Sequence, residues 1–267
     1  MQARARARPA RLLCSALPTL ATALVGISCP TRRDHVDSQR IRPRRGVDRS
    51  PLLAGLPCVI ELARSTGGVV SHPVWNSNIH YHPVILAAVP PDASCILDVG
   101  CGDGILSAEL ACRGVPEVVG LDIDASVVTR ARTRHPQSGI AWLCADVLDA
   151  PFKQGSFDAV VSVAMVHHVD AARALRCFAQ LVRPGGSVAI VGLAANDWWD
   201  RPYAMLGAAA RLGLAAMRGH WEHSAPQCWP PPLTYRQMRR VAVRILPGAR
   251  FRRHLLGRYS IVWDRPL

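Results

Sequence analysis

Short apolar runs alternate with amphipathic stretches between residues 93 and 192. The apolar runs predict five buried strands, at 95–99, 118–122, 140–144, 157–163 and 187–192. Helical periodicity predicts helices from residue 105 to about 113, at 125–135 and at 170–181, and a turn at 183–186 before the last strand. Strands and helices in this order form an α/β fold, a doubly wound and mostly parallel sheet whose ligands bind beyond the carboxyl ends of the strands.

The pattern on either side of this core divides the chain further. A short helix is predicted at 84–89, an apolar helix at 205–217, a helix at 235–246, and strands at 249–256 and 260–264 that form an antiparallel C-terminal hairpin. We therefore expect a basic N-terminal extension at 1–70 and a folded domain at 71–267. Within the domain, 93–192 is the core, and the segment 193–234, with Trp198 and Trp199, is expected to cover a substrate.

The N-terminal extension has two interpretations. Four arginines precede an uncharged run at 12–31, an order that weakly resembles a secretory signal and is long enough for a membrane anchor. Pro18 and several small polar residues dilute the run, which favours a disordered segment outside the fold. We expect a cytoplasmic protein without a membrane partner, unless residues 1–30 act as a signal or an anchor.

Charge is distributed unevenly along the chain. The net charge is +13, with a pI near 10.2. Residues 1–70 carry 12 basic and 4 acidic groups (+8), residues 71–200 carry 8 and 13 (−5), and residues 201–267 carry 12 and 2 (+10). Lys153 is the single lysine, so nearly all of the positive charge is arginine. A nucleic-acid site could use lysine equally well as a counter-charge for phosphate, so the near absence of lysine weakens the case for a nucleic-acid partner.

A glycine loop follows the first predicted strand, where a ligand of such a sheet binds. Gly100 and Gly102 lack Cβ atoms, so the backbone can turn tightly and approach a bound group. Asp122 ends the second strand, 22 residues after Gly100, and a carboxylate there can accept both hydroxyl hydrogens of a ribose. The loop and Asp122 together predict a nucleoside cofactor.

The spacing of the loop separates two such cofactors. A dinucleotide fingerprint requires a third glycine at position 105, where the chain has Ile105, so a nicotinamide dehydrogenase is disfavoured. Asp98 lies two residues before the loop, and its carboxylate would repel a pyrophosphate but attract a cation. S-adenosylmethionine carries a sulfonium and an ammonium group, and the acidic balance of residues 71–200 agrees with such a ligand.

These segments resemble the class I S-adenosylmethionine-dependent methyltransferases, particularly the bacterial enzymes that act on small molecules. The matching segments are 96–104, 119–124, 145–148, 157–162 and 181–186, in the order of the family. The resemblance implies a seven-stranded sheet with the C-terminal hairpin at its edge. It also implies S-adenosylmethionine as the cofactor, with the methionine moiety at Gly100, Cys101 and Gly102.

The resemblance assigns the remaining cofactor contacts residue by residue. Asp122 would bind the ribose hydroxyls, Asp146 the adenine amino group, and Ile123 and Val147 would flank the adenine. Ser162 would lie near the cofactor at the end of the fourth strand. Two alternatives remain open, because Asp146 can cap a turn and Ser162 can be a buried hydroxyl that bonds to the backbone.

Two further candidates concern the reaction itself. Methyl transfer by in-line displacement chiefly needs positioning, and it needs a general base only when the acceptor must lose a proton. His167 is the candidate base, with His168 as the alternative if the local turn reverses their orientations. Upstream, Tyr81 or His82 would cover the cofactor, unless this segment is an ordinary amphipathic helix.

The sequence leaves four functions to compare. The leading one is methyl transfer to a small molecule at O, N or C; the others are a nucleic-acid methyltransferase, a non-catalytic cofactor-binding protein and the disfavoured dehydrogenase. His220, His223 and Cys228 lie among prolines and form no closed four-ligand set, so we expect no metal. The acceptor and the oligomeric state are not predicted.

Overall fold

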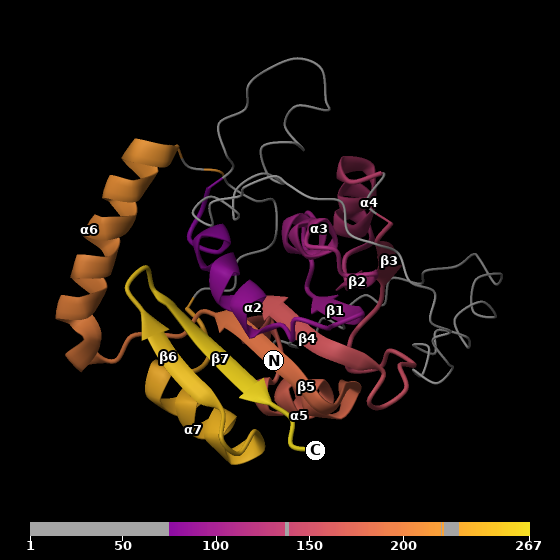
Figure 1. Cartoon of the computed structure of the whole chain (residues 1–267). Coiled ribbons are helices and arrows are strands. Elements are labelled where there is room, and N and C mark those ends of the chain that lie inside the picture. The colour runs from indigo at the N-terminus through magenta and orange to yellow at the C-terminus, as the bar shows by residue number, and fades with distance from the viewer. Residues whose placement is uncertain (1–74, 137–138, 220, 222–229) are drawn as a thin grey trace, which may run out of the picture. The chain divides into compact units, whose positions relative to one another are not determined.

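The computed structural model describes residues 75–136, 139–219, 221 and 230–267 (Figure 1). Within this part, seven strands form one sheet in the order β3-β2-β1-β4-β5-β7-β6. They are β1 (Cys95–Val99), β2 (Glu117–Asp122), β3 (Ala141–Cys144), β4 (Phe157–Val163), β5 (Val182–Gly192), β6 (Arg250–His254) and β7 (Arg258–Asp264). The first five strands are parallel, and β7 is antiparallel to both β5 and β6. The predicted doubly wound, mostly parallel sheet with an antiparallel C-terminal hairpin is confirmed.

Helices cover both faces of the sheet. The helices are α2 (His82–Ala88), α3 (Ile105–Cys112), α4 (Ala125–Arg134), α5 (Ala171–Leu181), α6 (Arg201–Arg218) and α7 (Tyr235–Ile245), with 3-10 turns η2 (Ile79–Tyr81), η3 (Val166–His168) and η4 (Trp198–Asp200). Figure 1 shows α3 and α4 on one side of the sheet and α5 and α7 on the other. Each face of the central strands is therefore buried, which explains why β1 is apolar at nearly every position.

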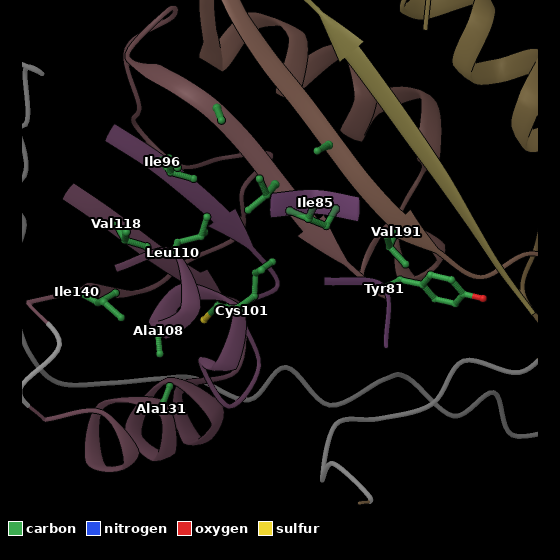
Figure 2. Close-up of a cluster of buried hydrophobic side chains, with 14 of the residues drawn as sticks. Tyr81, Ile85, Ile96, Cys101, Ala108, Leu110, Val118, Ala131, Ile140 and Val191 are labelled. Carbon is green, nitrogen blue, oxygen red and sulfur yellow. The ribbon is translucent and has the colours of Figure 1, made fainter. Parts of the chain in front are cut away.

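The core that supports the strand ends joins α2 and α3 to the sheet. Figure 2 shows Ile96 and Val118 from adjacent strands beside Leu110 of α3. Ile85 of α2 lies nearer Val191 of β5 in the same cluster. Because such packing is dense, the carboxyl ends of β1, β2 and β4 have fixed positions from which side chains can be directed at a ligand.

Acidic side chains begin the helices that follow two of the strands. The Asp124 carboxylate accepts hydrogen bonds from Ser126 N at 2.8 Å and Val127 N at 3.4 Å at the start of α4. The Asp170 carboxylate accepts one from Arg173 N at 2.7 Å at the start of α5. These caps satisfy N–H groups that the first helical turn leaves unbonded. They also fix the direction of the chain next to the strand ends.

The fifth strand differs from the prediction. Residues 183–186, predicted as a turn, are continuous with β5, which begins at Val182. Gly185 N donates to Arg265 O at 2.9 Å, and Arg265 N donates to Gly186 O at 2.8 Å. The chain beyond β7 thus supplies hydrogen-bond partners for this part of β5, which no local sequence signal reveals. The pairing of β5 with β4 shifts register between Phe157 and Ala159, which marks a bulge or irregularity there.

Several predicted features stay predictions. The helix predicted at 205–217 is present as the longer α6, but its role over a substrate is untested. The N-terminal extension at 1–70 and the residues His220, His223 and Cys228 lie outside the described residues. Across the part that is described, no helix combines the length and apolar character needed to cross a membrane.

Candidate functional site

A cavity of about 330 Å³ opens at the carboxyl ends of β1, β2 and β4. The strand order reverses between β1 and β4, which is where doubly wound sheets bind their ligands. The predicted loop contributes Asp98, Gly100, Cys101 and Gly102 to its lining. The next two strand ends contribute Asp122, Ile123, Asp146 and Val147. These eight residues, predicted as cofactor contacts, therefore line the same cavity.

The glycine loop is attached to the end of β2. Gly100 N and Cys101 N both donate to Leu121 O, at 2.7 and 3.0 Å. Gly100 has φ +72°, and a Cβ built on it would lie 2.6 Å from Met165 Cβ. Gly102 has φ +55°, but a Cβ built there would meet no atom within 4 Å. The loop thus packs tightly at Gly100 and leaves an open surface at Gly102, which a bound group can approach.

Asp122 is held in one orientation by the backbone. Gly102 N donates to Asp122 Oδ2 and Asp124 N donates to Asp122 Oδ1, both at 3.1 Å. A carboxylate oxygen accepts more than one hydrogen bond, so both oxygens can accept further donors from the cavity. This geometry fits two adjacent hydroxyl groups, as a ribose presents them.

Asp98 lies at the inner end of the cavity and is almost completely buried. Burial raises the pKa of Asp98 to about 6, although the hydrogen bond that Ser107 Oγ donates to Asp98 Oδ2 at 2.6 Å lowers it. His82 also lowers this pKa, while the carboxylates of Asp122 and Glu109 raise it. A cation bound beside these acids would favour the charged form of Asp98. The inner end of the cavity is therefore suited to a cationic ligand.

A polar group and two apolar side chains form the next part of the lining. Asp146 Oδ1 accepts a hydrogen bond from Leu148 N at 2.9 Å, so the turn-capping alternative describes this oxygen correctly. Val147 is buried, whereas Ile123 is 70% exposed at the mouth of the cavity. Two apolar surfaces near a carboxylate fit a planar heterocycle that carries an amino group.

The structure does not place Ser162 or Tyr81 in the lining of this cavity. Ser162 is buried and its Oγ donates to Val99 O at 2.8 Å, as the alternative for this residue states. The Tyr81 hydroxyl accepts a hydrogen bond from Leu256 N at 3.2 Å. Figure 2 shows its ring directed away from Cys101. The contacts of both side chains are thus structural.

Of the two adjacent histidines, His168 lines the cavity and His167 does not. Burial, followed by the charges of His168 and Arg258, lowers the pKa of His167 to about 4. Burial also lowers the pKa of His168, and the negative charge of Asp122 works against this shift. The 3-10 turn η3 thus produces the reversed orientation that the sequence left open.

Other lining residues come from segments with a weaker sequence signal. Asn76 and Asn78 precede η2, and His82 begins α2, where its Nδ1 lies 3.0 Å from Glu109 Oε2. Trp221 also lines the cavity, and its N donates to Trp75 O at 2.9 Å. A polar and aromatic run before a helix was the available signal for the first three. No described group of His, Cys, Asp and Glu residues has an arrangement that could hold a metal ion.

Known proteins resemble this chain in sequence and in fold. A family described as "Methyltransferase domain" matches residues 97–190, the span from β1 into β5. The chain is 44% identical over 199 residues to the uncharacterized methyltransferase Rv0089 of Mycobacterium tuberculosis, covering 72% of this chain and 98% of the relative. It is 33% identical over 134 residues to a ubiquinone biosynthesis O-methyltransferase of Ralstonia nicotianae, covering 45% of this chain and 56% of that protein.

Solved structures agree at the level of the fold. The PH0226 protein of Pyrococcus horikoshii has a TM-score of 0.52 at 16% identity, over 71% of this chain and 90% of that one. The CurJ carbon methyltransferase has a TM-score of 0.51 at 16% identity, over 71% of this chain and 54% of that one. The chain belongs to the class I S-adenosylmethionine-dependent methyltransferases and is a methyltransferase enzyme. Membership in this family implies S-adenosylmethionine as the cofactor.

Proposed function

We propose that this enzyme binds S-adenosylmethionine in the cavity above β1, β2 and β4 and transfers its methyl group to a small-molecule acceptor at O, N or C. The observation that carries the proposal is the Asp122 carboxylate, fixed by two backbone N–H groups beside the open surface of Gly102. We place this chemistry in the cytoplasm, where the cofactor is available.

Different residues of the cavity would contact different parts of the cofactor. Asp122 would accept the ribose hydroxyls, Asp146 the adenine amino group, and Ile123 and Val147 would contact the adenine faces. The loop around Gly102, with the buried Asp98 carboxylate behind it, would hold the cationic methionine moiety. The combination of polar anchors and apolar walls would orient the ligand and exclude water.

Methyl transfer needs little help from nearby acid–base groups. S-adenosylmethionine supplies an electrophilic methyl group when bound, so the protein's main task is to align an acceptor in line with the carbon–sulfur bond. If the acceptor must lose a proton, His168 is better placed than His167, because its ring lines the cavity. Its lowered pKa would keep the imidazole neutral and able to accept a proton at neutral pH.

Calorimetric titration of the protein with S-adenosylmethionine, S-adenosylhomocysteine and NADH tests the proposal. We expect both sulfur ligands to bind and NADH not to bind. Asp122→Ala removes two charge-assisted contacts and should weaken binding by at least about tenfold. Asp92→Ala, at an exposed carboxylate outside the cavity, is the matched control and should leave the affinity unchanged. Absence of binding by the sulfur ligands, or equal affinities of the Asp122→Ala variant and the unmodified protein, would refute the assignment.

A further inference from the structure

A group of basic side chains lies around Arg258, whose Nε donates to Asn78 of the cavity wall. It consists of Arg211 of α6, His80 of η2, His254 of β6 and Arg258 of β7, and we call it the basic cluster. Burial comes first among the causes that lower the pKa of His80 and of His254, but nearby arginines lower both further. The positive charge of Arg211 likewise lowers the pKa of Arg258. The lowered pKa values favour neutral histidines, so the positive charge of the basic cluster lies on Arg211 and Arg258.

Asp200, an acidic residue near Tyr235, is already paired. The Asp200 carboxylate forms an ion pair with Arg253, whose guanidinium also donates to Asn196 Oδ1 at 3.0 Å and lies over the rings of Tyr203 and Tyr235. Arg258 forms no ion pair with a described residue. The basic cluster therefore holds an arginine that no acidic side chain of the described residues pairs with.

Arg258 has unused hydrogen-bond donors. Its Nε donates to Asn78 Oδ1 at 2.8 Å, and its Nη1 donates to Gly257 O at 3.2 Å. A guanidinium has five N–H groups, so three remain without an acceptor in the described part of the chain. Burial lowers the pKa of Arg258 to about 10, which still leaves the side chain charged at neutral pH. No Arg258 nitrogen is among the buried atoms that lack a partner, so its spare donors are open to water or to a ligand.

Asn78 connects this arginine to the cavity. Asn78 lines the cavity wall, while its Oδ1 accepts from Arg258 Nε and so fixes the plane of the guanidinium. Five carboxylates line this cavity, those of Asp98, Asp103, Asp122, Asp124 and Asp146. Arg258 does not line the cavity itself but is hydrogen-bonded to Asn78, which does.

We propose that Arg258 binds a carboxylate group of the methyl acceptor, so that the substrate is an organic acid. The proposal rests on the proposed methyltransferase function and adds the class of substrate. Two parallel N–H groups of a guanidinium match the two oxygens of a carboxylate, and Arg258 has the donors for such a contact. Arg258 is a specificity-determining residue in this account, and the carboxylate is the part of the acceptor that it holds.

Binding of matched acids and amides to the full chain tests this inference. The protein is first saturated with S-adenosylhomocysteine, and hexanoate, hexanamide, phenylacetate and phenylacetamide are then titrated by ligand-observed NMR. We expect the two carboxylates to bind at least about tenfold more tightly than their amides, the factor of a charge-assisted hydrogen bond. Equal binding of acid and amide, or no binding of either acid, would overturn the proposal.

Three variants separate a specific contact from general charge. Arg258→Gln should weaken carboxylate binding by at least about tenfold. Arg258→Lys keeps the charge but loses the paired N–H groups of the guanidinium, so its affinity for carboxylates should lie between those of Arg258→Gln and the unmodified protein. Arg240→Gln removes an exposed arginine of α7 that has no contact with the basic cluster and should have no effect. An equal loss for the Arg240 and Arg258 variants would contradict the proposal, as would an Arg258→Lys variant that binds both acids with unchanged affinity.

Two controls keep the outcomes distinct. The affinity for S-adenosylhomocysteine is measured before any acid is added and should stay within about twofold in every variant. If the unmodified protein fails to bind it, the proposed function itself fails, whatever Arg258 does. Hexyl phosphate is titrated in parallel, and a clear preference for it over hexanoate would assign the site to phosphate and overturn the carboxylate assignment.

Discussion

At the scale of single residues, the raised pKa of Asp98 predicts how cofactor affinity depends on pH. Above about pH 6 the carboxylate is charged and attracts the cationic ligand; below it, the neutral acid does not. Affinity for S-adenosylmethionine should therefore fall by up to roughly tenfold per pH unit between pH 6 and 4.5. Calorimetry over this range measures the effect. Asp98→Asn should bind weakly with a much flatter profile, and parallel profiles for the two proteins would contradict the assignment.

The same carboxyl group has the opposite effect on the unliganded fold. Its folded pKa of about 6 exceeds the ordinary value of 3.8, so the folded state binds the proton more tightly than the unfolded state. Its contribution to stability should therefore increase as the pH falls from about 6 to 4. Denaturant titrations with and without ligand distinguish the two signs, and Asp98→Asn should lose this dependence.

Substitutions at the two glycines of the loop should have different consequences. Gly100→Ala combines a positive φ with a Cβ that overlaps Met165, so we expect it to destabilise the protein by about 2–4 kcal/mol in urea titrations. Gly102→Ala carries only the conformational cost, about 1–2 kcal/mol, but places a methyl group on the open surface of the loop. Its larger effect should therefore be on S-adenosylmethionine affinity. A reversed order of the two stabilities would contradict this description of the loop.

A site residue can be predicted from the sequence when its position depends on the neighbouring sequence alone. Gly100 and Asp122 are fixed by their distances from strand ends, and the structure places both at the cavity. Ser162 and His167 were chosen by the same logic, but a side chain beyond a strand end can turn either way. Ser162 finds a backbone carbonyl on β1, and η3 directs His168 inward instead. Arg258 lies far from every motif, so no sequence pattern indicated its proximity to Asn78.

At the scale of elements, one carboxylate connects three strands of the sheet. Asp158 of β4 accepts hydrogen bonds from Ser94 N, Ser94 Oγ and Cys95 N at 2.6–2.8 Å, and Arg183 of β5 donates to its other oxygen. Burial alone would raise the pKa of Asp158, but these hydrogen bonds outweigh it and lower the pKa. The stability that Asp158 contributes should thus be present near neutral pH and be lost below about pH 4.

Replacement of Asp158 tests this connection. Asp158→Ala leaves two backbone N–H groups and a guanidinium without their acceptor, and we expect a loss of about 2–4 kcal/mol in the free energy of unfolding. Asp264→Ala breaks the exposed pair with Arg250 and should cost at most about 1 kcal/mol. Equal losses in urea titrations would show that Asp158 does not join the strands in this way.

Elements were predictable where one segment determines its own structure. The runs at 95–99 and 157–163 coincide with β1 and β4, because a strand buried on both faces is apolar at most positions. The boundary of β5 was wrong because Arg265, at the far end of the chain, supplies its partners. The function of α6 could not be predicted either, because its apolar pattern indicates an amphipathic helix but not the surface that the helix packs against.

At the scale of the whole molecule, the +13 charge separates into parts with different roles. The acidic balance of residues 71–200 coincides with the carboxylates that line the cavity. The basic balance of residues 201–267 includes Arg258 and Arg211 of the basic cluster. The basic C-terminal part of the chain, which could have indicated a nucleic-acid partner, thus contains in our proposal the arginine that binds an acidic substrate.

The extension at 1–70 should be dispensable for cofactor binding. Rv0089 is matched over 98% of its length by 72% of this chain, so more than a quarter of this chain has no counterpart in that relative. We expect a fragment of residues 71–267 to bind S-adenosylhomocysteine within about twofold of the full chain and to unfold in one transition at the same urea concentration. A matched fragment of residues 95–267, which lacks η2, α2 and the buried Ile85, should fail to fold. If the 71–267 fragment binds the ligand much more weakly than the full chain, the extension takes part in the site and the domain boundary is wrong.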